Sequence, residues 1–96
     1  MGCFLLFYEL VDGFAEKRLP YRPEHQAHVD ASRARGEFTA AGAYGESGKV
    51  AALLFRGASL DAVRAFAGND PYVRSGLVHG WSVEPWDVDL DALTRR

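Results

Sequence analysis

A nearly continuous apolar run over residues 3–11 (CFLLFYELV) limits what this chain can fold into more than any other feature. The run is far shorter than the roughly 20 apolar residues that cross a bilayer, and Glu9 interrupts it. Its aromatic and aliphatic content is typical of a buried β-strand. Both alternating sets of side chains are apolar, so the strand needs apolar neighbours on both faces of its sheet.

The rest of the chain divides into segments with strand and helix signatures. Residues 24–35 contain no Gly or Pro, and Gly36 supplies a stop for a helix there. Ser59 is a suitable N-cap for a second helix, which Gly68 would end. The predicted elements are strands over 3–11, 37–46, 49–56 and 77–88, helices over 24–35 and 60–67, a loop over 12–20, a Ser47-Gly48 turn and a short turn at Asp70-Pro71. This order of strands and helices predicts a ferredoxin-like βαββαβ fold of the α+β class.

The length of 96 residues allows one domain with a modest core. Residues 52–55 repeat the two-sided apolar pattern of the first strand. Two helices can cover only one face of a four-stranded sheet, so the other face needs an apolar partner. The simplest partner is the same face of a second copy, and we expect a homodimer through the sheet faces.

Composition excludes several classes of protein. Eleven basic and thirteen acidic residues give a net charge of −2, which argues against an electrostatically driven nucleic-acid binder. Cys3 is the single cysteine, so an internal disulfide and a thiolate metal cage are excluded. The start of the chain lacks the basic region and cleavage site of a signal peptide, which predicts a cytoplasmic protein without membrane contact. No dinucleotide, phosphate-loop or haem-attachment motif is present, so no cofactor is expected.

Chain direction places several polar residues at one end of the predicted sheet. The first helix begins and the second helix ends where the first strand ends, so His25 and Asp70 come to the same end and the same side. Tyr44, near the end of the second strand, and His79, near the start of the fourth, reach that end as well. A carboxylate beside a histidine orients the imidazole and stabilises its charged form, which suits acid–base catalysis.

Other residues near this end have both functional and simpler interpretations. Arg22, three residues before His25, could hold an anionic substrate or an enolate oxygen, or pair with a nearby carboxylate. Asp70 precedes a proline, which is typical of a helix N-cap, and Tyr72 suits core packing as well as chemistry. His25 and His28 have a spacing that fits a metal site, but three histidines without a cysteine cluster make no convincing ligand set, and no metal is expected.

Motifs spread along the chain match one known family. They are Glu16-Lys17-Arg18-Leu19, Arg22-Pro23-Glu24-His25, Gly36, Gly42, Asp70-Pro71-Tyr72-Val73, Gly76 and Val83-Glu84-Pro85-Trp86. With these motifs the chain resembles the YCII-related domain (YciI-like) family to about Trp86, and residues 87–96 form a tail outside the resemblance. The resemblance implies a single YCII-like domain over residues 1–96 with the dimeric α+β barrel fold. One departure is Gly42-Ala43, where the family commonly has Gly-Pro.

The resemblance also implies a function. Its suspected catalytic histidine–aspartate pair matches His25 and Asp70, and some members carry out dehydrochlorinase or lyase-like chemistry on hydroxylated aromatic rings. We expect a cofactor-free lyase or isomerase in which His25 moves a proton, Asp70 orients His25 and Arg22 holds negative charge. Further substrate-binding candidates are Tyr44, Tyr72 and His79. The residues that could form a wall that stacks on a ring, or else pack in the core, are Tyr8, Tyr44, Tyr72 and Trp81. Two alternatives stay open, a small-molecule-binding or accessory protein without turnover and a cofactor-free oxygenase.

Overall fold

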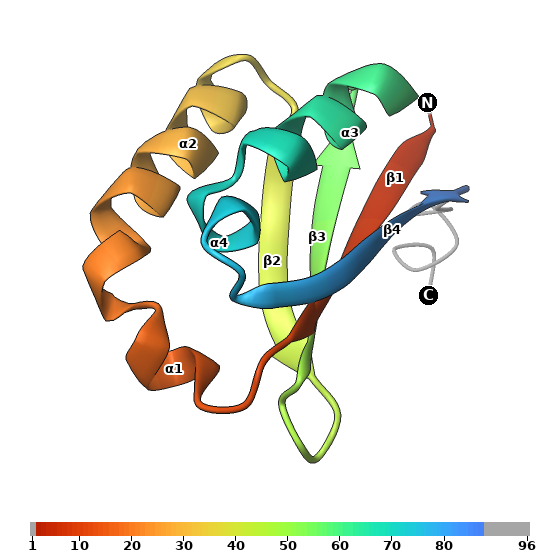
Figure 1. The fold of residues 1–96 in the computed structure, drawn as a ribbon. Coiled ribbons are helices and arrows are strands. Elements are labelled where there is room, and N and C mark those ends of the chain that lie inside the picture. The colour runs from red at the N-terminus through yellow and green to blue at the C-terminus, as the bar shows by residue number, and fades with distance from the viewer. Residues whose placement is uncertain (1, 88–96) are drawn as a thin grey trace, which may run out of the picture.

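One four-stranded antiparallel sheet forms the centre of the fold (Figure 1). The structure is a computed structural model that describes residues 2–87. The strands are β1 (Cys3–Leu10), β2 (Phe38–Tyr44), β3 (Val50–Arg56) and β4 (Val78–Trp86), and their order across the sheet is β2-β3-β1-β4. The apolar strand β1 therefore lies in the interior of the sheet, between β3 and β4.

The helices pack on one side of this sheet. They are α1 (Phe14–Lys17), the 3₁₀ helix η1 (Leu19–Tyr21), α2 (Arg22–Ala34), α3 (Leu60–Asn69) and α4 (Pro71–Arg74). Figure 1 shows α2 and α3 on the same side of the sheet, and α4 contacts α2, α3 and β4. The predicted ferredoxin-like α+β fold, which is the fold of dimeric α+β barrel proteins, is confirmed. Within residues 2–87 no helix is long and apolar enough to cross a membrane.

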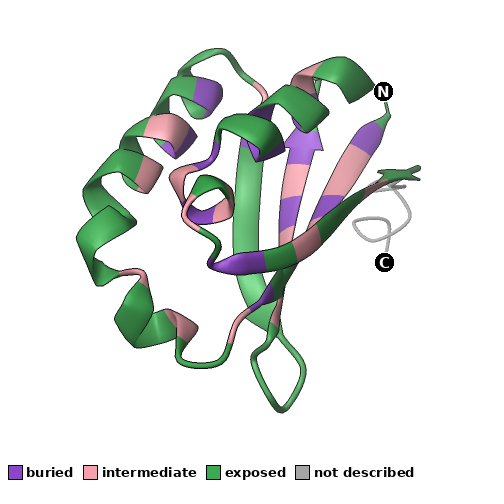
Figure 2. Cartoon of the chain, viewed as in Figure 1, coloured by how far each residue is buried: buried purple, intermediate pink, exposed green. Residues whose placement is uncertain are grey.

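Side chains along β1 alternate between a helix-covered face and an open face of the sheet. Leu6, Tyr8 and Leu10 are buried in the core under the helices. Leu5 and Phe7 point to the other face and are partly exposed. Figure 2 shows buried residues along β1 and β3, whereas nearly all of the edge strand β2 is exposed. The sheet thus has one apolar face that α2 and α3 do not cover.

The second long helix ends later than the sequence predicts. Gly68 was expected to stop it, but α3 continues to Asn69. A glycine inside a helix costs only about 1 kcal/mol relative to alanine, and the buried Phe66 and Ala67 anchor this turn in the core. The helix ends at Asp70 because Pro71 disfavours helical geometry in the residue before it, and Asp70 is extended with φ −67° and ψ 125°.

The segment predicted as a loop over residues 12–20 contains one helical turn and one 3₁₀ turn. Gly13, with a left-handed φ of 74°, precedes α1, and Pro20 lies in the first turn of η1. Such single turns have no amphipathic repeat, so no periodicity could predict them. The last strand ends at Trp86, and the part of its prediction that reached Val88 lies outside the described residues.

Candidate functional site

Asp70 is a buried carboxylate at the centre of a hydrogen-bond network. Its exposed fraction is 0%, and its Oδ1 accepts hydrogen bonds from His25 Nδ1 at 2.8 Å and from the Tyr72 backbone N–H at 2.9 Å. Its Oδ2 accepts a hydrogen bond from the Tyr8 hydroxyl at 2.8 Å. Three donors compensate a carboxylate for the loss of water. Asp70 is therefore both the N-cap of α4 and the partner of His25, so the two interpretations of this residue are compatible.

His25 lies in the first turn of α2, and its ring is fixed on two sides. It stacks on the Tyr72 ring with centroids 3.8 Å apart and planes 9° apart, and its side chain is 18% exposed. Because a carboxylate only accepts, Nδ1 carries the proton of the hydrogen bond to Asp70, which leaves Nε2 as the nitrogen that can exchange a proton with a ligand. The hydrogen bond expected between His25 and Asp70 is present. The catalytic roles of the two residues stay predictions.

Tyr8 has a role that the sequence did not reveal. The sequence made this residue a candidate for a ring-stacking wall or for core packing, and the structure buries its side chain in the core, 2% exposed, where it donates its hydroxyl hydrogen to Asp70. Burial raises the pKa of the Tyr8 phenol well above its ordinary value, and the negative charge of Asp70 raises the pKa further. Tyr8 therefore remains a neutral donor. The sequence did contain a clue to this hydrogen bond. Tyr8 belongs to a strand that the sequence predicts to be buried, and a buried Tyr hydroxyl normally finds a hydrogen-bond partner.

A pocket of about 180 Å³ lies beside His25, on the helix-covered side of the sheet. Its walls include His25, Tyr8, Tyr72, Phe14 and Arg18, and small residues of β2 form another part of its lining. A dry cavity of about 150 Å³ is known to hold benzene. The pocket is therefore large enough for one substituted six-membered ring beside the His25 side chain.

Arg18, and not Arg22, lines this pocket. The Arg18 Cζ lies 5.6 Å from the centroid of the Phe14 ring, and its Nε is buried with no hydrogen-bond partner. Burial raises the pKa of the Tyr72 phenol, while the positive charges of Arg18 and Arg22 lower it. Arg22, the anion-holding residue expected from the sequence, is exposed in the first turn of α2. The sequence did not identify Arg18 as a pocket residue, because residues 12–20 were predicted as a loop and a loop prediction does not indicate where side chains point.

The structure does not bring Tyr44 and His79 to this pocket. Tyr44 is 51% exposed and packs edge-on against Phe7, with ring centroids 6.4 Å apart, on the open face of the sheet. Tyr44 pairs with Val50 in β3, and this register gives it the opposite face from Tyr8. His79 is exposed at the start of β4 and is not among the residues that line the pocket. The order of elements correctly predicted the end of the sheet at which Tyr44 and His79 lie. The face on which a side chain lies depends on strand register, which that order does not determine.

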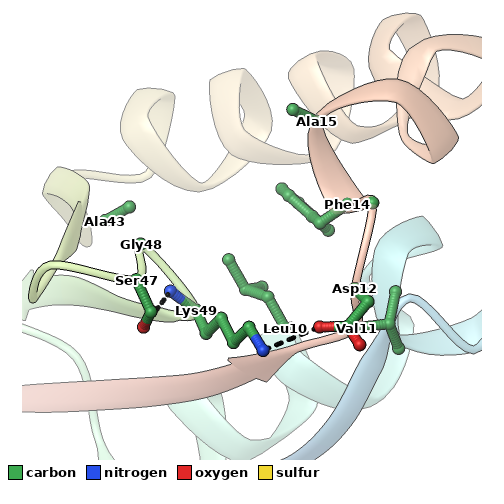
Figure 3. Close-up of a pocket in the computed structure, with 10 residues that line it drawn as sticks. Leu10, Val11, Asp12, Phe14, Ala15, Ala43, Ser47, Gly48 and Lys49 are labelled. Atoms are coloured by element: carbon green, nitrogen blue, oxygen red, sulfur yellow. Dashed lines mark hydrogen bonds and ion pairs between the residues drawn. The ribbon is translucent and has the colours of Figure 1, made fainter.

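A second hollow of about 330 Å³ adjoins the first, under α1 (Figure 3). The two hollows share Leu10, Phe14 and Ala43 as lining residues. Across the second hollow, Lys49 Nζ forms an ion pair with Asp12 Oδ1 at 2.8 Å, which lowers the pKa of Asp12 and raises the pKa of Lys49. Phe14 is therefore one of three residues that border both the His25 pocket and the neighbouring hollow, which the hairpin after β2 also borders.

His28, the other histidine of α2, has a different environment. Its Nε2 lies 2.8 Å from the Phe66 carbonyl oxygen, and its ring stacks on the Phe66 ring. His28 is thus a packing residue between α2 and α3, and it does not line the pocket beside His25. Among residues 2–87, no three His, Cys, Asp or Glu side chains gather as the ligands of a metal ion would.

The fold and the site together define a class, a small ferredoxin-like α+β domain with a histidine–carboxylate pair at the wall of a ring-sized pocket. Comparison with protein families makes the assignment specific. The chain belongs to the YCII-related domain family, whose profile matches residues 3–87. A search of curated proteins found no match.

Solved structures with the same fold cover almost the whole chain. One is 5-chloro-2-hydroxyhydroquinone dehydrochlorinase (TftG) from Burkholderia phenoliruptrix AC1100 in complex with 2,5-dihydroxybenzoquinone, with a TM-score of 0.72 and 23% identity over 93% of this chain and 97% of that chain. Another is a NIPSNAP family protein from Agrobacterium tumefaciens, with a TM-score of 0.60 and 13% identity over 92% of each chain. A third is PA3566 from Pseudomonas aeruginosa, with a TM-score of 0.59 and 13% identity over 92% of this chain and 93% of that chain. At these identities the likeness establishes the fold.

Proposed function

We propose that this protein is an acid–base enzyme that moves protons on a small hydroxylated aromatic substrate, with His25 as the catalytic base and acid. One observation carries the proposal: the buried Asp70 carboxylate binds His25 Nδ1 while the His25 ring lines a pocket of ring size. A buried carboxylate that serves only as a helix cap needs no imidazole partner. The pairing of a fixed imidazole with a carboxylate beside a pocket is typical of general acid–base sites.

Each polar group has a part in the proton transfer. The neutral His25 ring accepts a substrate proton at Nε2, and the resulting imidazolium keeps its Nδ1–H on Asp70, whose negative charge stabilises it. The Tyr8 hydroxyl and the Tyr72 backbone N–H hold the carboxylate in place, so they act as positioning groups. The imidazolium then returns the proton to another atom of the ring or to water.

The reaction class that we favour is elimination of hydrogen chloride or a related proton shift. Its support is the fold shared with a dehydrochlorinase of a chlorinated hydroxyhydroquinone. Loss of hydrogen chloride from such a ring gives a hydroxyquinone, one proton and one chloride ion, with no change in the number of electrons and no co-reactant. His25 Nε2 takes the proton, and a positive charge at the pocket wall favours the departing chloride.

The test is chloride release from 5-chloro-2-hydroxyhydroquinone under anaerobic conditions, measured by ion chromatography. We expect turnover by the unchanged protein and a loss on the order of 10²–10⁴-fold in His25→Ala, the usual contribution of a general base. Gln26→Ala is the matched control, because Gln26 is the exposed neighbour that bonds only Asp30. A His25→Ala variant with undiminished chloride release would exclude this mechanism. Ring binding without chloride release by the unchanged protein would indicate the non-catalytic binding function.

A further inference from the structure

A continuous series of aromatic contacts holds Arg18 at the pocket wall. Its guanidinium lies over Phe14, and Phe14 packs edge-on against Tyr72 with centroids 5.2 Å apart and planes 87° apart. Tyr72 in turn stacks on His25. A guanidinium over an aromatic face gains cation–π attraction and loses freedom of movement. Arg18 is therefore a positioned positive charge on the same wall as the catalytic imidazole.

No carboxylate among residues 2–87 neutralises this charge. The ion pairs found there are His25–Asp70, Arg35–Glu37 and Lys49–Asp12. The Arg18 Nε–H is buried without a hydrogen-bond partner among these residues, which leaves the desolvation of this polar group uncompensated. Buried polar groups in proteins are rarely left in this state without a functional reason. A site that holds a cation without a counter-ion is suited to a ligand that brings the negative charge.

We propose that Arg18 selects an anionic ring, binding an ionised hydroxyl or quinone oxygen of the substrate while His25 acts on another atom of the same ring. The inference rests on the proposed function in taking the His25 pocket as the substrate site. The hydroxyquinone product of the proposed elimination is a vinylogous acid that is ionised near neutral pH, with its charge spread over planar oxygens, and the substrate develops the same charge when a ring hydroxyl loses its proton. The planar guanidinium matches such oxygens in charge and geometry better than an ammonium group does. Arg22 is the natural comparison, since it has the same charge and is close to Tyr72, yet it does not line the pocket.

The test compares two rings that differ in charge and little in shape. Calorimetric titration at pH 7.5 with 2,5-dihydroxybenzoquinone, an anion, and with 2,5-dimethoxybenzoquinone, its neutral ether, gives the affinity of each. We expect Arg18→Gln to weaken binding of the anion by about 10- to 100-fold, the range for charge-assisted hydrogen bonds, and to change binding of the neutral ether by less than about 3-fold. Arg18→Lys should fall between the two, and Arg22→Gln should stay within about 3-fold of the unchanged protein for both rings.

Several outcomes would overturn the role of Arg18. Two of them concern Arg18→Gln: it binds the anion as tightly as the unchanged protein does, or it loses the same affinity for both rings. The other two are a loss of affinity for the anion in Arg22→Gln as large as that in Arg18→Gln, and failure of the unchanged protein to bind the anion. Thermal unfolding of each variant shows whether it is folded, and Arg18→Lys keeps the test valid if Arg18→Gln is not. Failure of the proposed function has a different signature: chloride release would be absent in the unchanged protein or undiminished in His25→Ala, whatever the affinities of the Arg18 variants.

Discussion

At the scale of single residues, Asp70 combines two duties that are usually separate. As an N-cap it accepts the Tyr72 N–H, and as a partner it fixes the His25 ring. The amide of Asn has a similar shape and can still accept at Oδ1, so it keeps the cap but lacks the charge that stabilises an imidazolium. This difference separates the structural role of the residue from its proposed chemical role.

We therefore predict that Asp70→Asn folds with a thermal midpoint close to that of the unchanged protein but loses activity on the order of 10²–10⁴-fold. The loss follows from the missing counter-charge, because the Asn Oδ1 that keeps the cap still accepts the His25 Nδ1–H but a neutral amide does not stabilise the imidazolium that forms. Circular dichroism and the chloride assay provide the measurements. Full activity in a folded Asp70→Asn protein would show that Asp70 is a cap alone.

Tyr8 gives a prediction about pH. Its pKa is raised in the folded protein, first by burial and then by Asp70, whereas the unfolded chain has the ordinary value of 10.0. The folded state holds the proton more tightly, so the Tyr8 contribution to stability is present below about pH 10 and is lost as the pH rises above it. Tyr8→Phe lacks this proton, so its free energy of unfolding should fall less between pH 7 and pH 11 than that of the unchanged protein.

The measurement is urea unfolding of both proteins at the two pH values. At pH 7 we expect Tyr8→Phe to be less stable by about 1–3 kcal/mol, because Asp70 Oδ2 loses its buried donor. At pH 11 the gap between the two proteins should narrow, and the raised pKa of Tyr72, present in both, cancels in the comparison. A gap that stays constant or widens with pH would contradict this account of Tyr8.

At the scale of elements, the sequence predicts the positions of residues at helix ends. It does not predict the positions of residues that depend on strand register or that lie in single helical turns. The meeting of His25 and Asp70 was predictable because the order of elements fixes where α2 begins and α3 ends. Tyr44 was expected at that end of the sheet, and its place on the open face follows from strand register, which turn residues and alternating polarity could not settle where both faces are apolar. The Tyr8–Asp70 hydrogen bond joins residues 62 positions apart, beyond the reach of any local pattern.

The single turn α1 yields a prediction about specificity. Phe14 is the largest of the three side chains that line both the His25 pocket and the neighbouring hollow, so we expect Phe14→Ala to open a connection between the two spaces. We expect this variant to bind 2-hydroxy-1,4-naphthoquinone more tightly, relative to 2,5-dihydroxybenzoquinone, than the unchanged protein does. The same change should lower stability by about 1–3 kcal/mol, less than the loss of a fully buried phenylalanine, because Phe14 is partly exposed.

Calorimetric titration with both rings measures the ratio of affinities. Phe4→Ala is the matched control, because Phe4 is also partly buried against the core but does not line either hollow. An unchanged ratio in Phe14→Ala, or the same change in Phe4→Ala, would show that Phe14 does not set the size of the bound ring.

At the scale of the whole molecule, the open face of the sheet is the feature that the single chain leaves unexplained. Leu5 on β1 is paired with Leu54 on β3, and Phe7 is paired with Ala52, so apolar side chains run across the two central strands on this face. The α2 and α3 helices cover the opposite face (Figure 1). Proteins that remain monomeric rarely expose a contiguous apolar patch of this kind. The dimer expected from the sequence therefore remains our prediction.

Light scattering at micromolar concentration should give about twice the chain mass of 10.6 kDa, since an isologous contact of two such faces closes after two copies. Leu54→Glu should reduce the mass to that of one chain, because a dimer would bury two unpaired carboxylates in an apolar interface. Ala27→Glu adds the same charge at an exposed position on α2 and should leave the mass unchanged. A single-chain mass for the unchanged protein would remove the argument from the open face, whereas a loss of mass in both variants would point to a contact through the helices.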